Sequence, residues 1–251
     1  MMEGYHREIF EEDLKEMGIS ITNEQMFRFI RYYEMLTEWN RRMNLTAITE
    51  YEEVLKKYFV DSLSLVHVYD IRNNDSVIDV GTGAGFPGLA LKIAFPDMEI
   101  TLLDSLNKRI QFLNAVIEEL GLKGVRTVHG RAEDFARPGE LRESFDLCVS
   151  RAVANLATLA EYCLPFVKKG GLFIAYKAEN ASRELTAAQK AIAILGGRTK
   201  ESLEFVLPNS DISRTLFVIE KEMPTPLKYP RKAGLPGKEP ICMRVSNHGG
   251  K

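Results

Sequence analysis

The sequence predicts an α/β fold in which an open, doubly wound sheet follows a helical N-terminal extension. From about residue 76, short apolar segments alternate with amphipathic ones at the pace of strand–helix–strand units. Before that point, apolar residues recur at helical spacing. The length of 251 residues fits one large α/β domain with a smaller appendage. We therefore expect an extension over residues 1–70 and a sheet-containing domain over 71–251.

The extension is expected to hold a long helix and a short one. Apolar residues from Met26 to Leu36 keep helical spacing. Just before them, Thr22 and Gln25 have the pattern of a capping box, in which each side chain accepts a hydrogen bond from a free backbone N–H. The shorter helix is predicted at about 51–58.

The sheet is expected to contain parallel strands at 77–80, 99–104, 125–128, 145–149 and 172–176. Helices are expected between them at 88–94, 108–120, 156–164 and 184–195, with Gly121 as a left-handed C-cap. Two closing strands, at about 204–207 and 216–219, are predicted to be antiparallel.

The charge is unevenly distributed. The whole chain has a net charge of −2, but residues 1–50 carry −4 and residues 221–251 carry +5. The last residues, about 223–251, are rich in Pro, Gly and Lys and predict an extended, basic C-terminal arm. We expect Arg231, Lys232 and Lys238 in this arm, with Lys177 at the end of the fifth strand, to bind RNA phosphates. A solvated tail is the alternative.

The cysteines do not predict a metal or a redox site. Cys148, Cys163 and Cys242 have no C-x-x-C spacing and no neighbouring histidine cluster. The first residues lack the apolar core of a signal peptide, and no apolar run reaches the roughly 18 residues of a membrane helix. We expect a cytoplasmic protein without a metal or a membrane partner.

A glycine-rich segment between the first strand and its helix carries the strongest local pattern. Residues 79–88 read D-V-G-T-G-A-G-F-P-G. Glycines at such a junction let the backbone approach a ligand, and the helix N-terminus offers free N–H groups. A turn without a ligand is the alternative, which four glycines in this segment disfavour.

Two cofactors fit this segment. Gly83, Gly85 and Gly88 match the dinucleotide pattern G-x-G-x-x-G. Asp79 and Gly81, followed by the next two glycines, match D-x-G-x-G-x-G, the first motif of Rossmann-like, class I methyltransferases that use S-adenosylmethionine (SAM). SAM is favoured because Asp79 can reach the cationic methionine ammonium, directly or through water. The long helical segment before the strand also disfavours a dinucleotide domain. A nicotinamide-dependent oxidoreductase is the alternative.

Acidic residues follow the next two strands. Asp104 ends the second strand, where its carboxylate can accept hydrogen bonds from both ribose hydroxyls or cap the next helix. After the third strand, the backbone of Ala132 and the carboxylate of Glu133 or Asp134 are expected beside the adenine, with a simple capping turn as the alternative.

The fourth strand ends at Ser150 and Arg151, which should face the methyl group. The sequence there has no N-P-P-Y, D-P-P-Y or Pro-Cys motif, so we expect an acceptor that needs no deprotonation, such as guanine N7. Arg151 can bind a cofactor carboxylate, a phosphate or the guanine O6/N7 edge, or form a surface salt bridge. We expect it to orient cofactor or guanine, with no obligatory base.

Together these motifs resemble the RsmG family, also called GidB, of bacterial 16S ribosomal RNA guanine-N7 methyltransferases. The resemblance runs nearly end to end. It rests on Trp39-Asn40, Asn44-Leu45-Thr46-Ala47-Ile48, Phe59-Val60-Asp61-Ser62-Leu63, residues 79–88, Leu103-Asp104-Ser105, Lys108-Arg109, Arg131-Ala132-Glu133, Ser150-Arg151-Ala152-Val153-Ala154 and Arg231-Lys232-x-Gly234-x-Pro236.

The resemblance implies methyl transfer from SAM to guanine 527, in the 530 loop of 16S ribosomal RNA, on the RNA or the small subunit. It also implies a SAM site that includes Phe86, Ser105 and Leu106 beside the residues already named. Ala178 departs from the glycine that family members often have after the lysine. A non-catalytic ribosomal RNA-binding factor is a further alternative, and we expect a monomer.

Overall fold

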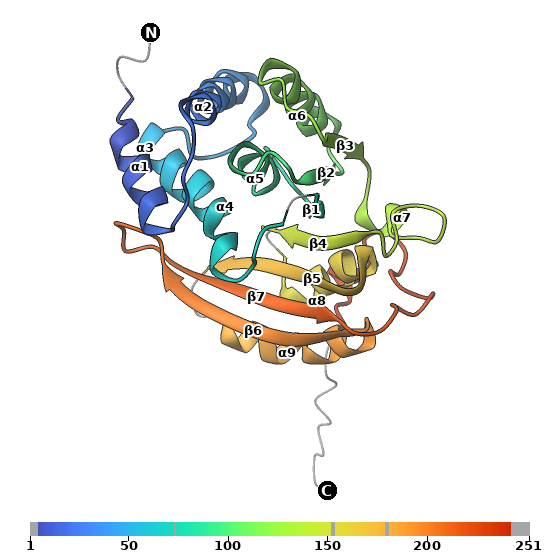
Figure 1. The fold of residues 1–251 in the computed structure, drawn as a ribbon. Helices are drawn as coiled ribbons and strands as arrows, with labels where there is room; N and C mark the ends of the chain where they lie inside the picture. The colour runs from blue at the N-terminus through green and yellow to red at the C-terminus, as the bar shows by residue number, and fades with distance from the viewer. Residues whose placement is uncertain (1–4, 73, 152–153, 179–180, 242–251) are drawn as a thin grey trace, which may run out of the picture.

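The computed structural model describes residues 5–72, 74–151, 154–178 and 181–241. Its centre is a seven-stranded sheet in the order β3-β2-β1-β4-β5-β7-β6 (Figure 1). The pairing is parallel from β3 to β5, and β7 pairs antiparallel with both of its neighbours. The strands are β1 (Ser76–Val80), β2 (Glu99–Asp104), β3 (Val125–His129), β4 (Phe145–Ser150), β5 (Val167–Ala178), β6 (Gly197–Val206) and β7 (Ser213–Lys221).

This topology confirms the predicted fold class. The chain builds outward from β1 through β2 to β3 and then returns to the other side of β1 with β4. In open α/β sheets, ligands bind at the carboxyl ends of the strands where the order reverses in this way. The topology therefore places a ligand site beside the ends of β1 and β4.

Helices cover both faces of the sheet. α1 (Arg7–Glu16), α2 (Asn23–Met43), α5 (Gly88–Ala94) and α6 (Asn107–Glu119) lie on one side, and α8 (Leu156–Cys163) and α9 (Ser182–Ile194) lie on the other (Figure 1). Successive side chains of a strand point to opposite faces. In β5, accordingly, Ile174 belongs to the core under the first group of helices, and Phe173 and Ala175 belong to the core under the second.

The helical extension shares its core with the sheet. Buried Phe10 and Phe29 of the first two helices belong to the same hydrophobic cluster as Val77 of β1 and Leu102 of β2. Since burial of apolar surface is the main favourable term in folding, the extension and this face of the sheet stabilise each other.

A continuous helical segment runs from residue 51 to residue 67, longer than the predicted 51–58. It consists of α3 (Tyr51–Val54), the π-helix η1 (Leu55–Val60), α4 (Asp61–Leu63) and the 3₁₀-helix η2 (Ser64–His67). Within it, Ser64 is buried and its Oγ donates to the Asp61 carbonyl at 2.7 Å.

Both predicted helix caps are confirmed, whereas β5, β6 and β7 are longer than predicted, with β7 at Ser213–Lys221 against the predicted 216–219. Thr22 and Gln25 form the reciprocal capping box of α2, and Gly121 follows α6 at φ +59°. β6 begins at Gly197, seven residues before the predicted 204. The sequence did not reveal this first half of the strand because its outward positions are polar and exposed. β5 extends beyond the predicted 172–176 at both ends because its partners in β4 and β7 continue to pair with it.

Candidate functional site

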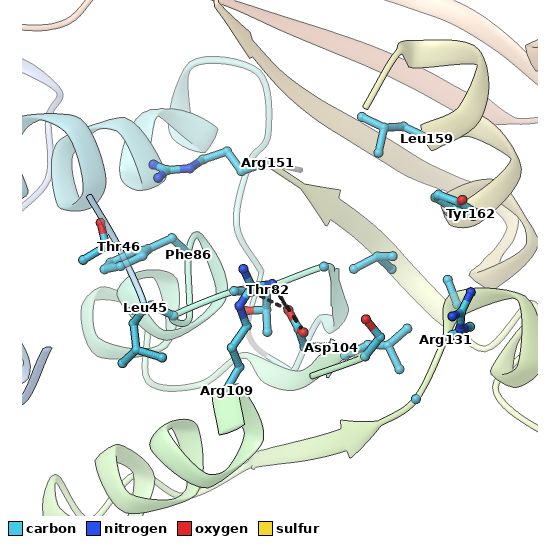
Figure 2. A pocket seen from close by; sticks show the side chains of 18 of the residues that line it. Leu45, Thr46, Thr82, Phe86, Asp104, Arg109, Arg131, Arg151, Leu159 and Tyr162 are labelled. Atoms are coloured by element: carbon cyan, nitrogen blue, oxygen red, sulfur yellow. Dashed lines mark hydrogen bonds and ion pairs between the residues drawn. The ribbon is translucent and has the colours of Figure 1, made fainter. Parts of the chain in front are cut away.

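A cavity of about 580 Å³ lies at the carboxyl ends of β1, β2 and β4, where the strand order reverses. This volume is in the range of small-molecule sites, roughly 300–1,000 Å³. Leu45 and Thr46 of the extension lie on one side, and Leu159 and Tyr162 of α8 lie on the other (Figure 2). The cavity is therefore bounded by parts of the chain that are far apart in sequence.

The glycine loop, residues 81–86, forms the floor between β1 and α5. Gly85 has φ +101°, and a Cβ there would meet the Tyr32 hydroxyl and lie 2.7 Å from Leu89 Cδ1. Gly83 has φ +64°, lines the cavity, and a Cβ there would meet nothing within 4 Å. Gly85 thus allows tight packing beneath the loop, and Gly83 keeps the cavity side open.

Asp79 lies beneath this loop and does not line the cavity. It is fully buried, and its Oδ2 accepts hydrogen bonds from Thr82 Oγ1 at 2.6 Å and from the Gly88 backbone N–H at 2.8 Å. Its Oδ1 is buried with no hydrogen-bond partner among the described residues. Burial raises the pKa of Asp79 to about 7 because it disfavours the charged form. Asp79 holds the loop to α5, and its contact with a cofactor ammonium stays a prediction.

Asp104 lines the cavity and ties three segments together. Its Oδ2 accepts from the Gly83 backbone N–H at 3.0 Å and pairs with Arg109 Nη1 at 3.1 Å, and its Oδ1 accepts from the Leu106 N–H at 2.9 Å. The alternative role of helix N-cap is wrong, because Leu106 occupies that position of α6. The ribose contact of Asp104 stays a prediction.

Ala132 and Glu133 begin the short helix α7 (Ala132–Phe135), and both line the cavity. Glu133 is 4% exposed, and its Oε1 accepts a hydrogen bond from the Gly234 N–H at 2.7 Å. One carboxylate therefore contacts the C-terminal arm and also borders the cavity.

The C-terminal arm packs beside α7 and α8 (Figure 1). Its described part includes a helical turn, α10 (Leu235–Lys238), where the sequence predicted extended chain. Arg231 binds the fully buried carboxylate of Glu161 through Nε and Nη2, the latter at 2.6 Å. Thr158 donates to the Pro236 carbonyl at 3.0 Å. Residues 242–251 lie outside the described residues.

The predicted RNA-binding residues fall into two groups. Lys177 pairs with Glu184 at 2.7 Å and donates to the Ala154 carbonyl, so its ammonium is held within the protein, as is the guanidinium of Arg231. Lys232 and Lys238 are exposed. The phosphate contacts of all four stay predictions, and exposure favours those of the two lysines.

Arg151 lines the cavity just beyond β4. Its guanidinium carbon lies 5.1 Å from the ring centroid of Tyr58 and 5.6 Å from that of Phe86. Its Nη1 pairs with the carboxylate of Asp61 at 3.2 Å. Since the Arg151 and Asp61 side chains are only 15% and 6% exposed, this pair is buried rather than the surface salt bridge considered as an alternative.

Most of the cofactor-binding residues predicted from the sequence line one cavity. These are Gly81, Gly83, Phe86, Asp104, Ser105, Ala132, Glu133 and Arg151. Asp79, Gly85 and Leu106 do not line it. Sequence reasoning assigned no role in the site to Leu45, Thr46, Tyr58, Arg109, Arg131, Leu159 and Tyr162, which also line it.

The chemistry of this cavity fits SAM. The apolar side chains of Leu45, Phe86 and Leu159 suit an adenine ring and a thioether chain. The carboxylates of Asp104 and Glu133 provide acceptors for ribose hydroxyls and an exocyclic amine.

The sequence matches the profile of the family GidB, rRNA small subunit methyltransferase G, over residues 25–213. The chain belongs to the GidB family. Among its relatives, the ribosomal RNA small subunit methyltransferase G of Lachnoclostridium phytofermentans is 53% identical over 235 residues, covering 94% of this chain and 97% of the relative. That of Geobacillus thermodenitrificans is 49% identical over 232 residues, covering 92% and 98%.

Solved structures with low sequence identity share the fold of this GidB-family chain. A chain from the complex of the Haloferax volcanii Trm112 methyltransferase activator with a methyltransferase aligns with a TM-score of 0.56 and 14% identity, covering 75% of this chain and 98% of that one. A variant of MtNAS in complex with S-adenosylmethionine aligns with a TM-score of 0.52 and 18% identity, covering 85% and 84%. These likenesses concern the fold alone.

Within the described ranges, no group of three or more His, Cys, Asp or Glu residues is arranged to hold a metal ion. In the same part of the chain, no helix is long and apolar enough to cross a membrane. Cys148 and Cys163 are buried and free, while Cys242 lies outside the described residues.

Proposed function

We propose that this GidB-family chain transfers a methyl group from SAM to N7 of a guanine in 16S ribosomal RNA, at position 527 in the 530 loop. The observation that carries the proposal is the cavity at the ends of β1, β2 and β4, lined by the glycine loop and two carboxylates. Relatives that are 53% and 49% identical over nearly their whole length are ribosomal RNA small subunit methyltransferases.

Different residues of the cavity contact different parts of the cofactor. The backbone of Gly81 and Gly83 runs beside its amino-acid portion, Asp104 accepts from the ribose hydroxyls, and Ala132 with Glu133 borders the adenine. When bound, SAM supplies an electrophilic methyl group on a sulfonium, and S-adenosylhomocysteine is the product.

The acceptor needs alignment rather than deprotonation. Guanine N7 carries an in-plane lone pair and no proton, so no side chain has to act as a base. Arg151 orients the cofactor or the guanine, and the rings of Tyr58 and Phe86 beside it exclude water from the reacting atoms. The rate then depends on how well these groups fix the approach of N7 to the methyl carbon.

The RNA surface consists of exposed basic residues near the cavity. Lys232 and Lys238 of the arm are exposed, and Arg131 is exposed at the cavity wall. Phosphate contacts of this kind make binding weaken as salt concentration rises.

Residues 1–70 act as a helical extension that supports residues 71–251, the methyltransferase domain with its basic arm over about 223–251. The protein works as a monomer in the cytoplasm, and light scattering of the purified chain tests the monomeric state.

Methyl-labelled SAM and small ribosomal subunits that lack the modification test the activity. We expect label in 16S ribosomal RNA, and digestion to nucleosides should yield 7-methylguanosine. Parallel reactions with naked RNA and with partial particles identify the substrate form. Asp104→Ala is the control for dependence on the cofactor site.

Two results would support the alternatives. Binding of RNA without transfer of label would support a non-catalytic binding factor. Saturable binding of NAD without binding of SAM would support an oxidoreductase.

A further inference from the structure

Asp61 lies between two arginines, one just after β4 and one in β7. Its Oδ2 accepts from Arg151 Nη1 at 3.2 Å, just after β4, and from Arg214 Nε at 3.0 Å, near the start of β7. The side chain of Asp61 is 6% exposed. The side chains of the two arginines are 15% and 21% exposed. One buried carboxylate therefore balances two guanidinium groups, and only Arg151 of the three lines the cavity.

The hydrogen bonds from Arg151 to other described residues all come from one nitrogen of its guanidinium, Nη1. Its Nη1 also donates to the carbonyls of Lys57 at 3.0 Å and Tyr58 at 3.5 Å, both in the π-helix η1. The π-helix is a rare geometry that is frequent at functional sites. No hydrogen bond from Nε or Nη2 to another described residue is found. These two nitrogens form the parallel fork that binds a carboxylate with two hydrogen bonds.

We propose that Asp61 is a positioning residue that holds the Arg151 guanidinium over the rings of Tyr58 and Phe86, so that its free fork takes the carboxylate of SAM. The proposal rests on the proposed function only in its choice of ligand. The carboxylate is the only anionic group of SAM, and an arginine fork matches its planar shape. Without Asp61, Arg151 and Arg214 repel each other in a partly buried place, and the fork loses its fixed orientation.

Equilibrium dialysis of the full-length protein against labelled SAM, and against decarboxylated SAM, tests this role. The second ligand has every group of the first except the carboxylate. Asp61→Asn keeps the shape of the side chain and removes its charge. We expect it to weaken binding of SAM about tenfold and to change binding of decarboxylated SAM by less than about twofold. Equal losses for both ligands, or no loss for SAM, overturn the proposal.

Arg214→Met separates positioning from charge balance. Arg214 does not line the cavity, and without it Asp61 still pairs with Arg151, so the single variant should bind SAM within about twofold of the natural protein. The double variant Asp61→Asn with Arg214→Met restores the charge balance and still lacks the carboxylate that holds Arg151. It should remain about tenfold weaker for SAM. Full recovery of binding shows that Asp61 only balances charge and overturns the proposal.

The folding of each variant is checked by thermal unfolding, monitored by circular dichroism. Where Asp61→Asn does not fold, the charge-balanced double variant gives the same comparison against Arg214→Met. Because binding is read without RNA, failure of methyl transfer to RNA refutes the proposed function and leaves this test intact.

Discussion

The hydroxyl of Tyr32 donates a hydrogen bond to the carbonyl oxygen of Ala84 and thereby joins the N-terminal extension to the glycine loop. Tyr32 is fully buried in α2 and stacks on Phe86, with ring centroids 5.3 Å apart and planes 19° apart. Phe86 in turn lines the cavity. The extension thus supports the cofactor loop from the side opposite the cavity.

Tyr32→Phe removes this bond and leaves the Ala84 carbonyl buried without its partner. We expect the free energy of unfolding to fall by about 1–3 kcal/mol, and SAM to bind several-fold more weakly because the loop is less rigid. Urea unfolding and equilibrium dialysis measure the two effects. Tyr33→Phe is the matched control, since the Tyr33 hydroxyl donates to the Thr49 carbonyl at an exposed position. Equal effects of the two substitutions would contradict the prediction.

Gly85→Ala should destabilise the protein more than Gly83→Ala. Both glycines have a positive φ that costs an alanine roughly 1 kcal/mol or more. Only at Gly85 would the new methyl group also collide with Tyr32 and Leu89. We expect a loss of about 3 kcal/mol or more at Gly85 and of about 1 kcal/mol at Gly83, measured by urea unfolding. A larger loss at Gly83 would show that the packing beneath the loop is looser than described.

Asp79 makes stability depend on pH in a defined direction. Its pKa is about 7 in the folded protein against an ordinary value of 3.8, so the folded state binds more protons between these values. The stability that Asp79 contributes therefore falls as pH rises through this window, by up to about 1.4 kcal/mol per pH unit. Asp79→Asn does not titrate. The free energy of unfolding of the natural protein minus that of this variant should decrease from pH 4 to pH 8, and a constant difference would contradict the assignment.

Substitutions should distinguish the exposed lysines of the arm, which we expect to bind RNA, from Arg231, which stabilises the fold. Lys232→Ala with Lys238→Ala removes two exposed charges, so RNA binding should weaken and the slope of log affinity against log salt should drop by about two. Stability and SAM affinity should not change. Arg231→Ala instead leaves the buried Glu161 carboxylate without its partner and should destabilise the protein by about 3–5 kcal/mol. Filter binding at several salt concentrations and thermal unfolding test both expectations.

The fold and the floor of the site were predictable because they depend on local patterns. The strand at 77–80, the glycines after it and Asp104 at the end of β2 are fixed by periodicity and by the conformations that glycine allows. Parallel strands meet at one edge, so residues after different strands had to converge there. Six residues predicted on these grounds line the cavity, and Phe86 and Ser105, which only the family resemblance implied, line it as well.

The walls of the site were not predictable from such patterns. Leu45, Thr46 and Tyr58 reach the cavity because the extension folds back over the loop, which depends on tertiary packing. For the same reason, the sequence showed Arg231 and Lys177 as basic residues but not their carboxylate partners Glu161 and Glu184. The sequence likewise placed Asp61 in a motif of the resemblance but did not show that it is buried between two arginines.

The shared core of the extension and the sheet has a consequence for synthesis on the ribosome. Tyr32 and Trp39 of α2 pack against Phe112 of α6, and Tyr32 also stacks on Phe86 just before α5. A nascent chain that has emerged only as far as His67 holds the mutual contacts of Phe10, Phe29 and Phe59 but lacks the partners of Tyr32 and Trp39. These surfaces stay open to chaperones or to other nascent chains until α5 and α6 leave the exit tunnel. Translation speed over roughly the first 120 codons therefore sets how long the unfinished chain is exposed to aggregation.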